Sequence, residues 1–139
     1  MKILLVLLLV ISQSVFADSN KMIVKKFVNA FNSKDVDSML GFASDDMQWM
    51  SIAADNISIE TSNREALKRA MQGYFQSMPS ARSEIRQTNE SGSFVYSLEE
   101  AFWTVKDIEK SQCSMAVYEF DEGKIKHVWY FPSHACSKQ

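Results

Sequence analysis

The sequence predicts a single α+β domain, because two different apolar periods divide the chain. Up to residue 78, apolar side chains recur mostly at the spacing of amphipathic helices, interrupted by one short pair of extended segments. From residue 83 onward the pattern changes to the alternation that is typical of strands. The segment Asp-Glu-Gly at 121–123 separates two alternating runs and is typical of a hairpin turn. Helices followed by an antiparallel meander indicate the α+β class.

Two helices are predicted at the start of the domain. Ser19 or Asn20 can cap the first, and its apolar residues recur at i, i+4, i+7 and i+8. This buried stripe consists of Ile23, Phe27, Ala30 and Phe31. Asp35 can cap a short second helix, which the polar segment 44–46 is expected to end.

A third helix and six strands complete the expected fold. Ser62 and Glu65 have the spacing of a capping box, which predicts the start of the helix, and Pro79 predicts its end. Strands are predicted at 47–52, 56–60, 83–88, 93–105, 112–120 and 124–131. In the last hairpin, Gly123 is expected to take the left-handed position of a three-residue turn. A curved sheet wrapped around the helices would form a cone with an apolar mouth.

The first 17 residues have the pattern of an export signal. Lys2 provides the positive charge, residues 3–11 form an unbroken apolar run, and Ala17 ends the Val-Phe-Ala segment that a signal peptidase would recognise. The run is too short to span a bilayer, which needs roughly 20 residues. We therefore expect cleavage after Ala17, one domain at 18–139, and a soluble protein in the periplasm or secreted.

Composition and charge exclude several classes of function. Without Lys2 the chain has 14 basic and 17 acidic residues and no basic run, which argues against nucleic acid or an anionic membrane as partner. There is no nucleophile elbow, no phosphate-binding glycine loop, no zinc-ligand spacing and no dinucleotide fingerprint. The sequence therefore predicts neither a metal nor another cofactor.

The only two cysteines, Cys113 and Cys136, both lie in the expected mature chain. An exported protein meets oxidising conditions, so a disulfide is one interpretation and two separate thiols are the other. In the expected hairpin, Cys113 lies opposite approximately Phe131, so the tail would have to fold back for the two cysteines to meet. Metal binding is disfavoured because no CxxC motif or repeated Cys/His spacing is present.

Several short motifs in this order resemble the nuclear transport factor 2-like superfamily, and especially its SnoaL-like branch. They are Phe-Val-Asn-Ala-Phe-Asn at 27–32, Lys-Asp-Val-Asp at 34–37, Ser-Asp-Asp-Met at 44–47, Asn-Arg-Glu-Ala at 63–66 and Tyr-Glu-Phe-Asp-Glu-Gly-Lys-Ile at 118–125. The resemblance covers nearly the whole mature chain. It implies a cone-shaped fold, a pocket between sheet and helices, and a homodimer formed through the outer sheet face. It implies no single chemistry, because the superfamily includes both enzymes and binding modules.

The resemblance also indicates which chemistry is absent. Ketosteroid isomerases of this fold use a tyrosine, a base aspartate and a protonated aspartate. The positions that match them here are Phe27, Ser51 and Ala116, which lack these groups. SnoaL-type cyclases use a carboxylate and a histidine, but residues 129–132 read Trp-Tyr-Phe-Pro where many relatives have an aspartate. The resemblance therefore disfavours both activities.

Three residues remain as candidates for catalysis. His127 is in phase with Ile125 and Trp129, so it could point into the pocket as a general acid or base, although a lone histidine on an apolar strand is more often structural. Glu99 and Glu100 are adjacent in a strand and should face opposite sides, so one could enter the cone with a raised pKa. The alternative for these glutamates is a bulge or a charge on the dimer face.

The sequence thus predicts a binding protein for a small hydrophobic molecule. The expected pocket-lining residues are Phe27, Trp49, Ser51, Trp103, Ala116, Tyr118 and Trp129. Large aromatic residues in such a set also occur as ordinary core. Two alternatives stay open: a lyase, isomerase or hydrolase that uses His127 with Glu99 or Glu100, and a non-catalytic dimeric interaction module of the cell envelope.

Overall fold

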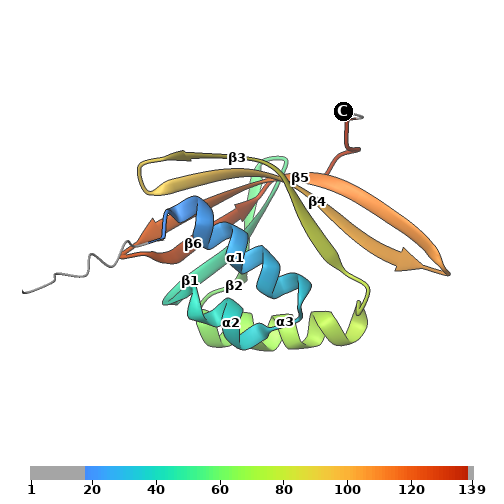
Figure 1. Ribbon diagram of the computed structural model, residues 1–139, viewed down its shortest axis with the longest axis horizontal. Coiled ribbons are helices and arrows are strands. Elements are labelled where there is room, and N and C mark those ends of the chain that lie inside the picture. The colour runs from blue at the N-terminus through green and yellow to red at the C-terminus, as the bar shows by residue number, and fades with distance from the viewer. Residues whose placement is uncertain (1–17, 138–139) are drawn as a thin grey trace, which may run out of the picture.

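The computed structural model describes residues 18–137 and has three helices on one side of a six-stranded sheet (Figure 1). The helices are α1 (Asn20–Asn32), α2 (Val36–Gly41) and α3 (Arg64–Ser77). The strands are β1 (Ala43–Ala53), β2 (Asn56–Thr61), β3 (Arg82–Ser91), β4 (Phe94–Val105), β5 (Ile108–Asp121) and β6 (Lys124–Tyr130). This order confirms the predicted α+β class.

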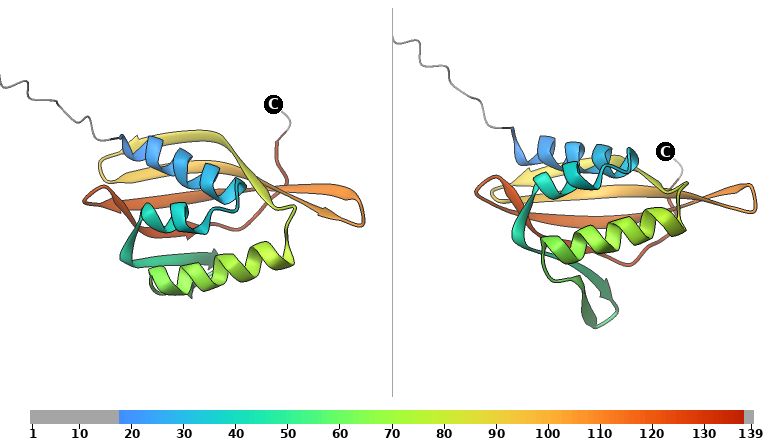
Figure 2. Two further views of the ribbon diagram at one scale, coloured as in Figure 1. Left: turned by 60° about the horizontal axis from the view of Figure 1, so that its bottom comes forward. Right: turned by 90° about the horizontal axis from the view of Figure 1, so that it is seen from below.

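The sheet has the order β2-β1-β6-β5-β4-β3. Neighbouring strands are antiparallel except for β1 and β6, which run parallel. Figure 2 shows the helices α1, α2 and α3 over one face, which we call the inner face. The opposite face, which we call the outer face, has no helix over it among the described residues. The far end of the β4–β5 hairpin extends beyond the helices (Figure 1).

Each helix begins at a polar cap. The side chain of Ser19 accepts a hydrogen bond from the Met22 amide, and Asp35 caps α2 through the Ser38 amide. The predicted capping box of Ser62 and Glu65 is wrong. Asn63 caps α3, with its side-chain oxygen 2.8 Å from the Ala66 amide.

The core lies between the inner face and the helices. The predicted stripe of α1 packs into this core, with Ile23, Phe27 and Ala30 buried and Phe31 partly buried. Val24, which the prediction did not include, is fully buried beside them. Leu67 of α3 and Val128 of β6 are also fully buried in the same cluster. The polar segment 44–46 does not end a helix as expected, because it belongs to the start of β1.

The last hairpin is correctly located but its turn is shorter than predicted. Glu122 and Gly123 form a two-residue connection, and both have positive φ, at 47° and 72°. Two consecutive positive φ values are characteristic of the turns whose twist matches paired strands. Lys106 and Asp107 form a similar connection between β4 and β5, with φ of 49° and 62°.

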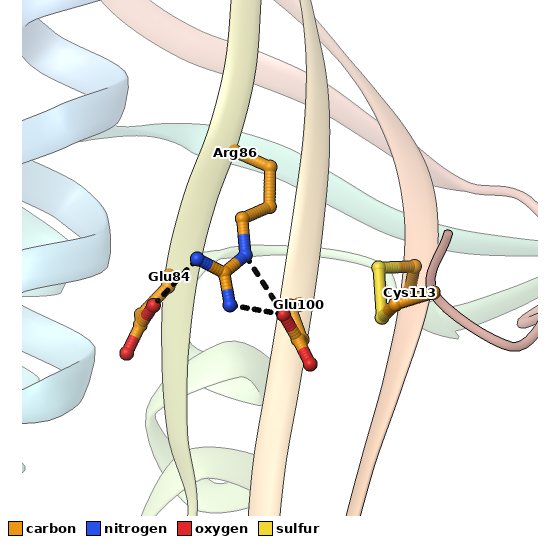
Figure 3. The surroundings of a disulfide bond; sticks show 5 residues. Glu84, Arg86, Glu100 and Cys113 are labelled. Atoms are coloured by element: carbon orange, nitrogen blue, oxygen red, sulfur yellow. Dashed lines mark hydrogen bonds and ion pairs between the residues drawn. A yellow bond between two sulfur atoms is a disulfide. The ribbon is translucent and has the colours of Figure 1, made fainter. Parts of the chain in front are cut away.

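The C-terminal tail folds back against the outer face, and Figure 3 shows the surroundings of its disulfide. Cys113 and Cys136 are joined, with their Cα atoms 5.1 Å apart. The Cys113 and His134 backbones exchange two hydrogen bonds of 2.9 Å, so the tail pairs with β5 beyond the end of β6. The proposed export signal at 1–17 lies outside the described residues. None of the helices in the described range is long and apolar enough to cross a membrane.

Candidate functional site

A cavity of about 430 Å³ lies between the inner face and the helices α1 and α3. Its volume is in the range of small-molecule sites. Its walls are formed by apolar and aromatic side chains: Phe27, Val28, Phe31, Trp49, Met71, Tyr74, Met78, Ala101, Phe102 and Trp103. Only a few polar side chains interrupt this surface. We call this cavity the pocket.

Glu99 is the carboxylate of the pocket, and two tyrosines hold it. The Tyr118 hydroxyl lies 2.7 Å from Glu99 Oε1, and the Tyr130 hydroxyl lies 2.6 Å from Oε2, both within hydrogen-bond distance. The two phenol oxygens lie 3.1 Å from each other. The three side chains come from three neighbouring strands, β4, β5 and β6. They form a compact group that we call the Glu99 cluster.

Small residues beneath the cluster explain why it fits. The strand register places Ala116 between Ser97 and Tyr130, and all three lie on the inner face. Since Ser97 and Ala116 have short side chains, the carboxyl of Glu99 can reach the Tyr118 hydroxyl above them. Ser97 is 1% exposed, and its hydroxyl has no hydrogen-bond partner of good geometry in the described part of the chain.

The cluster favours a neutral Glu99. Burial raises the pKa of the Glu99 carboxyl, and hydrogen bonds from Tyr130 and Tyr118 oppose this effect without cancelling it. Burial, followed by the nearby Glu99 charge, raises the pKa of both tyrosines well above 10. The cluster has three oxygen–oxygen contacts, and each needs one proton to be a hydrogen bond. If Glu99 is ionised, only the two phenol protons are present. If Glu99 is protonated, its own proton completes the third hydrogen bond.

Arg82 is the only cationic side chain that lines the pocket within residues 18–137. Its guanidinium stacks on the Phe102 ring, 3.7 Å from the ring centre, and binds Glu84 at 2.5 Å and Glu109 at 3.3 Å. Two carboxylates and an aromatic ring therefore hold this charge. Among the described residues, no lysine, arginine or histidine forms an ion pair with Glu99.

The structure does not bring the three candidate catalytic residues together. Glu99 faces the pocket, whereas Glu100 faces the outer side and binds Arg86, as Figure 3 shows. This opposite orientation is the one that strand alternation predicts. His127 is absent from the pocket lining, and its Nδ1 lies 2.6 Å from Glu119. An active site that combines His127 with either glutamate is therefore not formed.

A β-bulge explains why the expected orientation of His127 is wrong. Phe120 pairs with Ile125, but Glu119 pairs with His127, so Lys126 is an extra residue without a partner on β5. One inserted residue reverses the facing of every residue that follows it. Ile125 is fully buried, yet His127 turns to the outer face beside Trp129, with the two rings 5.3 Å apart.

Four of the seven expected pocket residues line the pocket: Phe27, Trp49, Trp103 and Tyr118. The other three do not. The bulge turns Trp129 outward, Ala116 is buried beneath the Glu99 cluster, and Ser51 donates to Glu60 at 2.5 Å. Sequence reasoning missed Tyr130, which the bulge brings inward.

Sequence reasoning also missed Tyr74 and Arg82. Tyr74 was detectable, because it lies on the apolar stripe of α3. Arg82 carried no such signal, since it enters the pocket at the first residue of β3.

The surroundings of the disulfide bring three potential metal-binding residues together without forming a metal site. Ligand atoms of Glu100, Cys113 and Cys136 lie within 4.8 Å of one another. The two sulfur atoms are bonded to each other, and the Arg86 guanidinium donates a hydrogen bond to the carboxylate of Glu100. These atoms therefore lack the thiolates that such a site would need.

Family comparison agrees with the fold. Residues 24–128 match the model of the SnoaL-like domain. This chain belongs to the SnoaL-like domain family. Its fold is the one also called NTF2-like or ketosteroid isomerase-like. No curated protein matches the chain.

Solved structures show the same fold at low sequence identity. An uncharacterised cystatin fold protein from Novosphingobium aromaticivorans is 21% identical, with a TM-score of 0.73, over 83% of this chain and 99% of that one. An NTF2-like protein of unknown function from Cytophaga hutchinsonii is 12% identical, with a TM-score of 0.63, over 81% and 88%. A hypothetical protein with a ketosteroid isomerase-like fold from Catenulispora acidiphila, solved in complex with trimethylamine, is 11% identical, with a TM-score of 0.68, over 79% and 84%. These similarities show the fold alone.

Proposed function

We propose that this SnoaL-like protein binds a small hydrophobic molecule in the pocket. The observation that carries this proposal is the cavity itself, about 430 Å³ in volume, with mostly apolar and aromatic walls and one buried polar cluster. Apolar walls supply affinity by removing ligand surface from water, and a few placed polar groups orient the ligand. The Glu99 cluster is the group that orients it.

Binding is better supported than the catalytic alternative that the sequence suggested. His127 and Glu100 lie on the outer face, so the pocket retains Glu99 as its carboxyl group and no histidine within the described range. General acid–base chemistry needs its groups within hydrogen-bond reach of one reacting atom. An enzyme that depends on His127 does not meet this requirement.

We further propose that the protein is exported and forms a homodimer through its outer face. The Cys113–Cys136 disulfide supports export, since such bonds persist in oxidising compartments. Exposed apolar residues on the outer face support the dimer, with Tyr96 43% and Met115 47% exposed. A dimer formed in this way leaves the pocket on the opposite side of the sheet.

A fluorescent probe tests the pocket directly. N-phenyl-1-naphthylamine is neutral and apolar and becomes bright when it leaves water, so titration of the mature chain should show one saturable site per chain. Ala101 lines the pocket, and Ala101→Trp fills part of its volume. We expect this variant to weaken probe binding at least tenfold, which corresponds to about 1.4 kcal/mol.

Ala53→Trp is the matched control, because Ala53 is exposed at the end of β1. This variant should bind the probe as the wild type does. Melting curves of both variants show whether the fold is retained. Unchanged probe affinity in a folded Ala101→Trp variant would contradict binding in the pocket.

A further inference from the structure

The Glu99 carboxyl has no cation to balance it when it is ionised. It is 4% exposed, and no basic side chain of the described chain forms an ion pair with it. A buried carboxylate without a cationic partner is strongly unfavourable, so it must take up a proton or meet a positive charge. In the empty pocket, a proton neutralises Glu99. In the occupied pocket the positive charge can come from the ligand, because Glu99 lines the cavity.

Aromatic rings surround the place where such a charge would lie. Tyr130 stacks on Trp49 with ring centres 5.1 Å apart, and Phe27 contacts both Trp49 and Tyr118. All four rings line the pocket together with Glu99. The faces of aromatic rings attract cations, and this attraction is strongest where water is excluded. The floor of the pocket thus combines one carboxyl group with several electron-rich rings.

The oxygen atoms of the cluster also match the donors of an ammonium group. If Glu99 is ionised, both phenol protons point at its carboxylate, and the 3.1 Å contact between Tyr118 and Tyr130 is left without a proton. A primary ammonium has three N–H donors and no acceptor. It can donate to the carboxylate and to the free lone pairs of both phenols. An ionised Glu99 leaves the cluster one proton short, and an ammonium ligand supplies the missing donor.

We propose that the pocket selects small aromatic or apolar amines, with the ammonium group held against Glu99 by Tyr118, Tyr130 and the surrounding rings. This inference rests on the proposed binding function of the pocket. The proton balance is closed in either of two ways. A free amine takes the proton from Glu99, or an ammonium ion enters and the Glu99 proton passes to the solvent. In both cases Glu99 ends as the carboxylate and the ligand as the cation.

The pocket offers no free cation to the opposite ligand class. An anionic ligand would keep Glu99 protonated, and the one cationic side chain that lines the pocket within residues 18–137, Arg82, is already bound by Glu84 and Glu109. The expected mature chain also has an excess of acidic residues, which attracts cations over distance. A neutral alcohol fits the apolar walls and can hydrogen-bond to the cluster, but it gains no ion pair.

Three ligands of one shape test the proposal on the mature wild-type protein. They are 1-naphthylmethylamine, 1-naphthylmethanol and 1-naphthoic acid, measured by isothermal titration calorimetry at neutral pH. We expect the amine to bind at least tenfold more tightly than the alcohol, and the acid to bind most weakly. Equal affinities for the amine and the alcohol would overturn the amine proposal and leave the binding pocket intact. A failure of all three ligands and of N-phenyl-1-naphthylamine to bind would overturn both proposals.

Two adjacent glutamates provide a matched pair of variants. Glu99→Gln removes the charge inside the pocket, and Glu100→Gln makes the same change on the opposite face. The amine should lose its at least tenfold advantage over the alcohol in Glu99→Gln and should keep it in Glu100→Gln. A melting curve shows that Glu99→Gln is folded, and both ligands are compared on the same variant. If the amine preference persists in Glu99→Gln, a general attraction to an acidic protein explains it and the proposal is wrong.

Discussion

At the scale of single residues, Glu99 and Glu100 show how the sheet separates two identical side chains. Burial raises the pKa of Glu99, the carboxyl of the pocket. On the outer face, hydrogen bonds from Ser111 and Arg86 hold the pKa of Glu100 below its usual value. Composition cannot distinguish the two residues, but strand alternation predicts that they face opposite sides. What alternation alone does not predict is which glutamate enters the pocket.

The raised pKa of Glu99 predicts a specific dependence of stability on pH. The folded state binds the Glu99 proton more tightly than the unfolded state does, so this contribution is fully present below the unfolded pKa of about 4.5 and is lost as pH rises through the higher folded pKa. Glu99→Gln cannot ionise. The free energy of unfolding of the wild type, minus that of Glu99→Gln, should therefore fall as pH rises above 4.5 and then level off. Each unit of pKa elevation contributes about 1.4 kcal/mol to this fall.

Urea unfolding at a series of pH values measures this difference. Tyr118 and Tyr130 do not titrate in the same range, since both pKa values lie well above 10. Glu100→Gln serves as the control with the opposite sign. In the wild type the pKa of Glu100 is lowered, so the stabilisation by Glu100 is present above the unfolded pKa and is lost on acidification. A flat difference curve for Glu99→Gln would show that Glu99 is not held neutral by the fold.

At the scale of elements, local signals predicted most of the fold and the bulge limited the prediction of the site. Helical stripes, Asp35 as a cap, Pro79 and the hairpin at Glu122–Gly123 are short-range features, and the structure contains each element that they indicated. The extra residue in β6, Lys126, depends on pairing with β5 and carries no glycine or other local sign. This extra residue turns His127 to the outer face and Tyr130 to the inner face. The predicted catalytic histidine therefore lies outside the pocket.

The C-terminal tail is the element whose stability depends on one covalent bond. The disulfide encloses a sequence separation of 23 residues and holds the tail next to β5. On the chain-entropy model, closing a loop of this length stabilises the fold by roughly 3 kcal/mol. We expect Cys136→Ser to lower the free energy of unfolding by about this amount. Urea denaturation under oxidising conditions measures the change.

The same experiment with a reductant supplies the control. Reduction should destabilise the wild type to about the level of Cys136→Ser, and it should leave Cys136→Ser itself unchanged. Because Cys113 is 3% exposed, the reductant is added to the unfolded protein before refolding. Equal unfolding midpoints for oxidised and reduced wild type would contradict a stabilising disulfide.

At the scale of the whole molecule, the two faces of the sheet have different surroundings. The inner face and the helices enclose the pocket. No helix covers the outer face in the described structure (Figure 2), and exposed apolar side chains lie on it. The strand register aligns Leu98 with Met115, and Tyr96 with Val117 and Trp129, in one patch. Large exposed apolar patches commonly mark protein interfaces. Glu99 and this patch use alternate residues of the same strands, so ligand binding and association need not compete for side chains.

Native mass spectrometry of the protein recovered from the periplasm or the medium tests export and dimerisation together. We expect a mass equal to two chains that each begin at Asp18, because cleavage after Ala17 removes the signal.

Met115→Lys places a charge in the centre of the outer patch and should yield monomers, since an unpaired charge buried at an interface is unfavourable. Ile108→Lys makes the same change at the tip of the β4–β5 hairpin, where Ile108 is 62% exposed and outside the patch, and should remain dimeric. A Met115→Lys dimer would place the interface elsewhere, and a chain that retains residues 1–17 would contradict export by cleavage at this site.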